Sequence, residues 1–294
     1  MERPRQPVRV GVFGTGVMGG HHVRLLSEIP GAELVGIFDA EPEVARSVAA
    51  QYGSRVFDSS ESLASEIEAA VVAAPTSAHR ELGGELLGRG IHVLMEKPLA
   101  GTLEEADALV SAAGNLVLAV GHVEFHNPAV ETVLSQGMKP GFVEVHRLGV
   151  FSPRSLDIDV VLDLMIHDLQ ILHSLDPSPV VALHAVGINV LTPKVDIANV
   201  RLELESGCVA NLTASRVSAE KIRKFRVFSG EGYLAVDYSQ QEVRGFRLEQ
   251  RGAEREIVRA DLEVVNQEPL RKELESFIAA CRGDTVARIV SGQI

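Results

Sequence analysis

The 294-residue sequence has no tryptophan, three tyrosines and only two cysteines, and aromatic residues make up 4% of the chain. The cysteines, Cys208 and Cys281, form no C-x-x-C pair, so neither a disulfide framework nor a structural zinc site is predicted. The sequence also lacks any apolar run approaching the roughly 18 residues that cross a membrane. We therefore expect a cytoplasmic protein without membrane spans, in which the thiols stay reduced.

Basic side chains are also in short supply. The chain has 28 lysines and arginines against 40 acidic residues, which gives a formal net charge of −12. A field of this sign repels phosphate backbones and anionic membrane surfaces, so neither a nucleic acid nor a membrane is an expected partner. The 46% hydrophobic fraction is that of an ordinary globular protein, and a length of 294 residues predicts two domains.

The first part of the sequence alternates short apolar runs with helical patterns. Apolar runs begin at Val8, Glu33, Ala69, Ile91 and Asn115, and a helical pattern follows each of the first four. Because these runs lack polar alternation, they are typical of parallel strands that are covered on both faces and joined by right-handed crossovers. We predict that residues 1–121 form an α/β Rossmann domain with a doubly wound parallel sheet.

After about Gly121 the pattern changes to that of a half-exposed sheet. Residues 200–205 (VRLELE) alternate strictly between apolar and polar side chains, and three further strand-like segments follow them. Helical stretches precede and follow these strands, at 160–175 and near 268–281. We expect residues 122–294 to form a second, α+β domain on a mostly antiparallel open sheet.

A glycine-rich turn connects the first predicted strand to the first helix, with G-x-G-x-x-G spacing. The glycines permit a tight turn and close approach of a pyrophosphate, which the free N–H groups of the helix N-terminus favour. Asp39 ends the next strand, where its carboxylate can bind a ribose 2′-hydroxyl and would repel a 2′-phosphate. This pattern favours NAD over NADP, and the alternative is a glycine-rich turn with a solvated aspartate. The predicted contacts are Gly14, Thr15, Gly16, Val17, Met18, Gly19 and Asp39.

Lys97 lies in the tripeptide Glu96-Lys97-Pro98, directly after an apolar run. This position places its ammonium at the carboxyl edge of the sheet, where open α/β sheets bind ligands. A partly desolvated lysine at that edge could exchange a proton with a hydroxyl or a carbonyl. Taken alone, Lys97 is better explained as a solvated loop residue, so its interpretation depends on the rest of the chain.

The predicted helix at 160–175 carries a polar stripe on an otherwise apolar surface. Asp163, His167, Gln170 and Ser174 fall on one helical face, and the stretch contains no lysine, glutamate or arginine. We infer that the helix is largely buried and that Asp163 and His167 face an enclosed polar space, where the carboxylate fixes the imidazole tautomer. A satisfied core histidine with a surface aspartate explains the spacing equally well.

His122 and His126 have metal-pair spacing, with Glu124 between them. The segment is interrupted by Asn127-Pro128, and its order does not match H-E-x-x-H, so helical ligand geometry is not expected. We predict no metal site.

Four motifs in order identify a family resemblance. They are GTGVMG at 14–19, Glu96-Lys97-Pro98, GHVEFHNPAV at 121–130 and DLMIHD at 163–168. Together they resemble the glucose-fructose oxidoreductase / inositol dehydrogenase / MocA (GFO/IDH/MocA) family over essentially the whole chain. The resemblance implies a Rossmann domain, a C-terminal domain whose open sheet often mediates oligomers, and NAD(P)-linked oxidation or reduction of a sugar-like carbinol.

The resemblance also implies roles for individual residues. Lys97 matches the catalytic lysine of the family, and Asp163 and His167 match its aspartate and histidine, with Asp163 orienting His167. The proton-transferring role falls on Lys97, with exchange of roles between Lys97 and His167 left open. The implied cofactor contacts are Ala74, Pro75, Thr76, His79, Glu96 and Lys97. The implied substrate contacts are Lys97, His122, Asn127, Asp163 and His167, and Arg154 is added as a cation for a diphosphate.

Within the family, GHVEFHNPAV and DVVLDLMIHDL are most similar to UDP-sugar 3-dehydrogenases, which commonly have Arg and Phe where this chain has Phe125 and His126. The expected function is NAD-dependent hydride transfer at a secondary carbinol of a sugar-type substrate, a UDP-sugar at C3, by a homo-dimer or homo-tetramer. Two alternatives stay open: a dehydrogenase of a free sugar, inositol or other small polyol, and a non-catalytic cofactor-binding regulator.

Overall fold

The computed structural model describes residues 6–153, 158–251, 254–285 and 287–292. Its contacts divide the chain into two compact units. The first unit contains residues up to His122 together with Leu270–Ile294, and the second is Val123–Pro269. Among the described residues, no helix has the length and apolar character to cross a bilayer.

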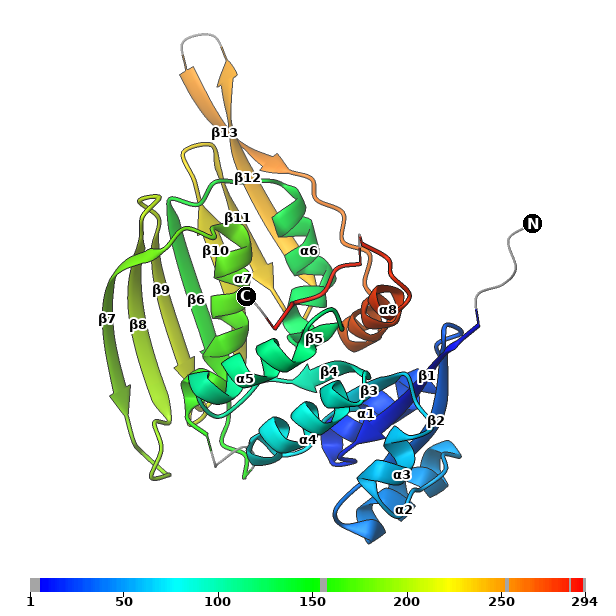
Figure 1. Ribbon diagram of the computed structural model, residues 1–294. Coiled ribbons are helices and arrows are strands. Elements are labelled where there is room, and N and C mark those ends of the chain that lie inside the picture. Colours follow the sequence, from blue (N-terminus) through cyan, green and yellow to red (C-terminus); the bar gives the residue numbers. More distant parts are fainter. Residues whose placement is uncertain (1–5, 154–157, 252–253, 286, 293–294) are drawn as a thin grey trace, which may run out of the picture. The chain divides into compact units, whose positions relative to one another are not determined.

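The first unit is built on a five-stranded parallel sheet with strand order β2-β1-β3-β4-β5 (Figure 1). Successive residues of β3 and β5 point to opposite faces of the sheet, and all of them are buried. Helices therefore cover both faces, which confirms the predicted doubly wound sheet. The strands are β1 (Val8–Phe13), β2 (Ala32–Phe38), β3 (Ala69–Val72), β4 (His92–Glu96) and β5 (Leu118–Gly121). The helices are α1 (Val17–Leu26), α2 (Pro42–Tyr52), α3 (Ser60–Ala64), α4 (Thr76–Gly88), α5 (Leu103–Ala113) and α8 (Pro269–Cys281).

Residues 270–294 group with the first unit, although the sequence analysis placed them in the second domain. Two contacts explain this grouping. Arg271 forms an ion pair with Glu28, and the N–H of Val120 donates to the carbonyl of Val290 at 2.9 Å. The chain thus returns to the sheet of the first unit after the second unit is complete.

The second unit contains an eight-stranded sheet with strand order β13-β12-β11-β10-β6-β9-β8-β7. Among the strand pairs that the structure describes in this sheet, only β6–β9 is parallel, which confirms the mostly antiparallel prediction. The strands are β6 (Phe142–Leu148), β7 (Val180–Ile188), β8 (Ile197–Leu204), β9 (Val209–Ser215), β10 (Ile222–Phe228), β11 (Gly232–Asp237), β12 (Glu242–Arg251) and β13 (Glu254–Ala260). The helical elements are η1 (Val123–His126), α6 (Pro128–Ser135), η2 (Val161–Met165) and α7 (Ile166–Leu175).

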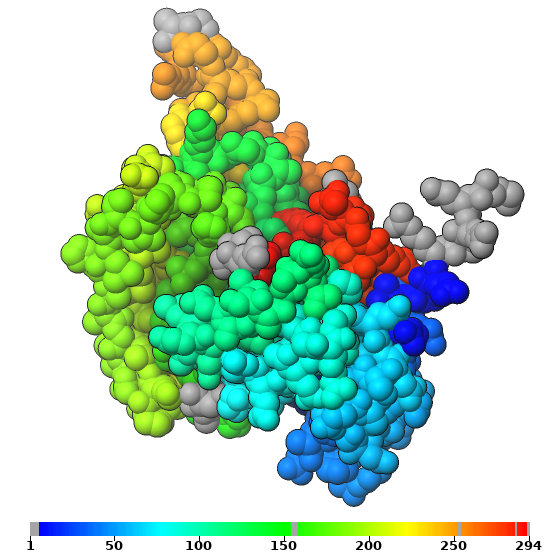
Figure 2. Space-filling model, in the orientation of Figure 1, coloured from blue at the N-terminus to red at the C-terminus, as the bar shows by residue number. Residues whose placement is uncertain are grey.

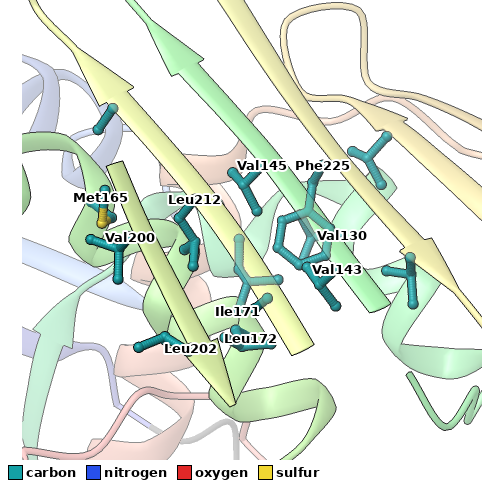
Figure 3. Packing of buried hydrophobic residues seen from close by; sticks show 14 of the residues in the cluster. Val130, Val143, Val145, Met165, Ile171, Leu172, Val200, Leu202, Leu212 and Phe225 are labelled. Carbon is teal, nitrogen blue, oxygen red and sulfur yellow. The ribbon is translucent and has the colours of Figure 1, made fainter. Parts of the chain in front are cut away.

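One face of this sheet packs on helices and the other is open. Along β6 and β9 the side chains alternate between buried and half-exposed, as the period of two in the sequence predicts. Figure 3 shows side chains from α6 and α7, including Val130, Ile171 and Leu172, packed against Val143 and Val145 of β6. The β12–β13 hairpin extends beyond the other strands of this unit, as its orange segment shows in Figure 2.

Candidate functional site

The glycine turn after β1 is tightly constrained by its own backbone. Gly14 has φ +84°, and a Cβ there would lie 2.6 Å from the backbone nitrogen of Ala74. A Cβ on Gly19 would lie 2.0 Å from the carbonyl oxygen of Gly14. Both positions therefore require glycine. A side chain at Gly14 would clash with the backbone after β3, and one at Gly19 would force α1 away from the glycine turn.

Gly16 differs from these two glycines. A Cβ built on Gly16 would meet no atom within 4 Å, and Gly16 is the N-cap of α1 without a side-chain capping bond. The first turn of α1 thus presents backbone N–H groups to open space, which is an anion-binding arrangement. The adjacent Val17 is 82% exposed, an unusual state for a valine that begins a buried helix. The residues present fit the pyrophosphate of a dinucleotide, with Gly14–Gly19 as its cradle.

Asp39 lies just past the end of β2 and is tied to the glycine turn. Its Oδ2 accepts hydrogen bonds from the Thr15 backbone N–H at 2.5 Å and the Thr15 hydroxyl at 2.9 Å. Its Oδ1 accepts from the N–H of Glu41 at 2.9 Å. The carboxylate is thus held beside the turn while remaining partly exposed. Further lone pairs on both oxygens leave it able to accept a ribose hydroxyl.

The loops after β3 and β4 are joined by a buried histidine. The two ring nitrogens of His79 lie 2.9 Å from the carbonyl oxygens of Ala74 and Pro98. His79 is in the first turns of α4, which begins at Thr76 with Pro75 as its N-cap. This bridge fixes the segment that contains Lys97, where the Lys97–Pro98 peptide is cis. The structure therefore gives His79 a supporting position, and a direct cofactor contact stays a prediction.

Glu96 and His122 lie beside Lys97 at the carboxyl ends of β4 and β5. The Glu96 Oε1 is 2.8 Å from Nε2 of the fully buried His22. Gly121 is the register partner of Glu96, and its missing side chain leaves room for the carboxylate. Burial, followed by the positive charge of Lys97, lowers the pKa of His122 to about 4. His122 is therefore neutral at physiological pH, while Lys97 itself is half-buried.

In the second unit, Asp163 and His167 come from a helix that begins with a π-helical turn. The sequence predicts one continuous helix, whereas Val161–Met165 form η2 and α7 starts at Ile166. Asp159 begins the turn by accepting hydrogen bonds from the N–H groups of Val161 and Leu162 at 3.0 Å. Single π-helical turns often occur at functional sites because they redirect side chains. Asp163 and His167 are both buried, as the stripe predicts.

A buried ionic cluster that was not predicted from the sequence lies next to His167. Arg147 on β6 donates through Nε and Nη2 to the Asp168 carboxylate at 2.6 and 2.7 Å, and through Nη1 to Glu124 at 3.0 Å. The Tyr238 hydroxyl donates to Asp168 at 3.1 Å, and the guanidinium lies 4.8 Å from the Tyr238 ring centroid. These carboxylates raise the pKa of Arg147 against the opposing effect of burial, so its charge is permanent. We define Arg147, Asp168, Glu124 and Tyr238 as the Arg147 cluster.

The Arg147 cluster connects three elements of the second unit: β6, the η1 turn and α7. Asp168 directly follows His167, so the two bonds from Arg147 fix the helix at that residue. Asp168 lies in an otherwise apolar helical stretch, and this position could have indicated a buried carboxylate that needs a partner. Its partner Arg147 lies 21 positions away and could not be paired with it from spacing.

Both units match family patterns of known proteins. The sequence pattern of the oxidoreductase family with an NAD-binding Rossmann fold (GFO/IDH/MocA) matches residues 8–122, and that of the GFO/IDH/MocA C-terminal domain matches residues 140–235. The chain is 41% identical to a UDP-N-acetylglucosamine 3-dehydrogenase of Acidithiobacillus ferrooxidans over 234 residues, 79% of this chain and 74% of the relative. The chain belongs to the GFO/IDH/MocA family.

Other relatives agree with this assignment. The crystal structure of the Acidithiobacillus ferrooxidans enzyme superimposes with a TM-score of 0.89 at 35% identity and covers 98% of this chain and 93% of that one. An inositol 2-dehydrogenase of Rubrobacter xylanophilus is 33% identical over 181 residues, 58% of this chain and 52% of the relative. An inositol dehydrogenase homologue from Azotobacter vinelandii, complexed with NAD+, shares the fold with a TM-score of 0.83 at 20% identity, covering 98% of this chain and 91% of that one.

As a GFO/IDH/MocA oxidoreductase, the chain has a NAD-binding Rossmann unit, and several predicted substrate contacts can now be located. Asn127 is buried as the N-cap of α6, where its amide donates to Glu124 and to the carbonyl of Tyr238. Gln170 donates to Ser174 at 2.9 Å, so these two members of the predicted stripe bind each other. Arg154 lies outside the described residues. Substrate contact by Asn127 or Arg154 stays a prediction.

Two surface hollows of the first unit lie at the opposite edge of its sheet. One of about 540 Å³ is lined by residues that include Glu68, Arg89 and His92, near the starts of β3 and β4. A second, of about 670 Å³, is lined by residues that include Val8 and Glu33. Open parallel sheets bind ligands at the carboxyl edge, so neither hollow is a candidate for the cofactor.

Proposed function

We propose that this oxidoreductase transfers a hydride between C3 of a UDP-sugar and NAD. The observation that carries the proposal is the similarity to the UDP-N-acetylglucosamine 3-dehydrogenase, with 41% identity over 79% of this chain and 74% of the relative. The glycine turn with its open Gly16 and the Lys97 segment at the carboxyl edge support it from the structure. NAD supplies the hydride acceptor when it is bound.

The proposed chemistry requires the hydroxyl proton to leave as the carbon is oxidised. We assign this proton to the Lys97 amine, with His167 hydrogen-bonded to the same hydroxyl and Asp163 orienting His167. A positioned base of this kind contributes about 10² to 10⁴ in rate. Neutral His122 beside Lys97 can hydrogen-bond without adding a second positive charge. Exchange of the roles of Lys97 and His167 gives the same overall proton balance.

A double-mutant cycle tests whether both residues serve one step. We expect Lys97→Met and His167→Asn each to reduce kcat by at least about 10² with UDP-N-acetylglucosamine and NAD. The double variant should lose little more than the worse single variant, because residues that act as a unit are not additive. Independent, multiplicative losses would contradict the assignment, as would near-normal kcat in either single variant.

A substrate panel separates the proposal from the remaining functions. Reduced-nicotinamide absorbance is followed with UDP-sugars, free sugars and inositols as substrates. Turnover confined to UDP-sugars supports the proposal. Turnover of free sugars or inositols instead would show that the substrate is a free polyol and not a UDP-sugar. Cofactor binding without any turnover indicates a regulator, an alternative that the change to Phe125 and His126 keeps relevant.

We propose further that NAD is preferred over NADP. The carboxylate of Asp39 is fixed beside the glycine turn by Thr15 and Glu41, where it would repel a 2′-phosphate. No arginine directly follows Asp39 to neutralise that phosphate. Asp39→Ala is expected to raise KM for NAD and to reduce the NAD to NADP selectivity. Unchanged selectivity would remove Asp39 as its determinant.

The second unit also supports a proposal of self-association through the open face of its sheet. Phe142, Phe228, Tyr233 and Phe246 form a row across four neighbouring strands, with successive ring centroids 4.7–6.2 Å apart. Phe246 remains 40% exposed at the end of this row. A second copy is the proposed occupant, in a dimer or tetramer. Light scattering after size exclusion should show the wild type as an oligomer and Phe246→Glu as smaller; a monomeric wild type refutes it.

A cytoplasmic location completes the proposal. Cys208 and Cys281 are both free thiols, and burial raises their pKa values to about 11 and about 12. Such thiols are unreactive and suit a reducing compartment. Cell fractionation with a compartment-specific thiol label tests this location.

A further inference from the structure

Arg216 and Asp196 form a second buried ion pair in the second unit, and the proposed chemistry does not use it. Ser215 at the end of β9 pairs with Ile197 at the start of β8, so Asp196 and Arg216 are the next pair along the two strands. Arg216 donates through Nε to Oδ1 of Asp196 at 2.8 Å. Arg216 is 5% exposed and Asp196 is 0% exposed. Two charges buried this completely are costly unless further hydrogen bonds satisfy them.

Asp196 fixes the loop between β7 and β8. Its Oδ2 accepts hydrogen bonds from the backbone N–H groups of Val190, Leu191 and Thr192 at 2.7–2.9 Å. The Thr192 hydroxyl donates to Oδ1 at 2.7 Å and accepts from Nη2 of Arg216 at 3.0 Å. Burial alone would raise the pKa of Asp196, but the bonds from Arg216 and from this loop hold it well below its ordinary value. We define Arg216, Asp196 and Thr192 as the Arg216 clamp.

The remaining arm of the Arg216 guanidinium reaches the segment that leads into η2. Its Nη1 donates to the carbonyl of Ile158 at 2.9 Å. On the other side of Asp159, the N–H of Val160 donates to the carbonyl of Val195 at 2.9 Å. Asp159 is therefore held on both sides, by the residue after β9 and by the loop before β8.

Asp159 connects this anchored segment to Asp163. Its Oδ1 accepts hydrogen bonds from the N–H groups of Val161 and Leu162 at 3.0 Å. Its backbone carbonyl accepts from the N–H of Asp163 at 2.9 Å. Hydrogen bonds thus run without a gap in the chain from Arg216 to Asp163, and the place where η2 begins determines where Asp163 lies.

The Arg147 cluster anchors the same helical segment at its other end. Arg147 binds Asp168 on α7 through two charged hydrogen bonds. Asp163 and His167 therefore lie between two anchored points, each made by a buried arginine. A π-helical turn such as η2 redirects the side chains around it, so the position of Asp163 depends on where that turn begins.

We propose that Arg216 is a positioning residue for Asp163: through the carbonyl of Ile158 it fixes the start of η2, and with it the position of the Asp163 carboxylate. The bond to Ile158 carries this role, because the other bonds of the Arg216 clamp hold only β8, β9 and the loop before β8. The catalytic value of the position rests on the proposed function, in which Asp163 orients His167. The anchoring of η2 does not rest on it.

Amide hydrogen exchange of the full chain tests the anchoring without any substrate. In Arg216→Lys the ammonium can pair with Asp196, but it lacks the planar fork that binds several acceptors at once. We expect the loss of the bond to Ile158 to speed exchange over residues 160–163 by about tenfold. Unchanged exchange over 160–163 in this variant overturns the proposal.

Thr192→Val is the matched control, because it removes a hydroxyl from the same clamp and leaves Nη1 of Arg216 bonded to Ile158. Exchange should become faster in the loop at 190–196 and stay unchanged over 160–163. Equal increases over 160–163 in Thr192→Val and Arg216→Lys would show general loosening of the unit and overturn the proposal.

Asp159→Ala breaks the same connection from the helix side and keeps the buried ion pair, so it serves even if Arg216→Lys does not fold. It removes the acceptor of the Val161 and Leu162 N–H groups. It should reproduce both the faster exchange over 160–163 and the loss of kcat expected for Arg216→Lys. Wild-type exchange and kcat in Asp159→Ala overturn the proposal.

Kinetics tests the consequence for catalysis. Arg216→Lys should lose about tenfold in kcat with UDP-N-acetylglucosamine and NAD, because Asp163 is displaced. KM for NAD should stay unchanged, because the clamp lies within the second unit. Thr192→Val should keep a near-normal kcat although its unfolding temperature also falls. A normal kcat in Arg216→Lys, or a kcat that follows the unfolding temperature in both variants, overturns the positioning role. If the wild type turns over no UDP-sugar, the proposed function fails while the exchange result still decides the anchoring.

Discussion

The Arg147 cluster provides the sharpest test of how the second unit is held together. Arg147 is 2% exposed and Asp168 is 1% exposed, so both charges lie in the interior. In Arg147→Met, the Asp168 carboxylate would keep a single donor of the cluster, the Tyr238 hydroxyl at 3.1 Å. The carboxylate of Glu124 would lose the bond from Arg147 as well, but it keeps the bond from Asn127, and its side chain is 20% exposed and can reach water.

Removing one partner of a buried ion pair costs about 3–5 kcal/mol, because the other charge is left uncompensated. We expect the free energy of unfolding of the second unit to fall by this amount in Arg147→Met, a large part of the roughly 5–15 kcal/mol of a typical domain. Urea unfolding followed by near-ultraviolet circular dichroism reports it, since two of the three tyrosines, Tyr233 and Tyr238, belong to this unit.

The double variant Arg147→Met/Asp168→Asn separates charge burial from lost packing. It removes the stranded carboxylate, so it should recover more than about 1 kcal/mol relative to Arg147→Met. Arg201→Met is the control, because that arginine is paired at 3.8 Å with Glu203 on an exposed surface and should cost under about 1 kcal/mol. A loss below about 1 kcal/mol in Arg147→Met, or no recovery in the double variant, would refute the reasoning.

Three further predictions concern the first unit. Gly16→Ala should fold with normal stability but bind NAD more weakly when binding is measured by calorimetry. Gly19→Ala should also lower the unfolding temperature, because its Cβ would meet Gly14. Equal stability of the two variants would contradict the turn geometry. Burial raises the pKa of Glu273 in the folded chain, so unfolding releases its proton above about pH 4.5. The free energy of unfolding of the wild type should therefore fall relative to that of Glu273→Gln as the pH rises above this value, by about 1.4 kcal/mol per pH unit while the native acid stays protonated. Parallel curves of stability against pH for the two proteins would contradict this. His79→Ala should reduce kcat more than NAD affinity, because it releases the Lys97 loop; loss of NAD binding alone would show the direct cofactor contact.

The first unit could be predicted from local signals. Uninterrupted apolar strands and a glycine turn are both encoded within a few neighbouring residues, so the Rossmann sheet follows from short segments of sequence. Asp39 was placed correctly at the end of β2, although its hydrogen bonds to Thr15 cross 24 positions and were not foreseen. The same locality explains why the alternating run at 200–205 predicts β8.

Features that depend on contacts between residues far apart in the sequence could not be predicted from the sequence. The edge strand β7 is exposed along most of both faces, so it shows no alternation and gave no strand signal. Residues 270–294 were assigned to the second domain because they follow it in sequence. Their grouping with the first unit depends on contacts with distant residues, such as Glu28, Ala119 and Val120. Glu273 was within reach, since a glutamate inside the apolar stripe of α8 is visible in the sequence itself.

His167 and Asp168 show that a motif residue and the residue that holds its helix in place can be different. The motif match singles out Asp163 and His167, whereas two short charged hydrogen bonds from Arg147 are made to Asp168, the residue after His167. Buried ion pairs are weak evidence for stability, because hydrophobic replacements of similar volume are often neutral or better. The Arg147 cluster binds α7 to β6 and η1 at the residue after His167. We therefore infer that its main effect is to fix the position of α7, and with it the position of His167. Such precision matters for catalysis, because a misplacement of about 1 Å can cost about 10² in rate.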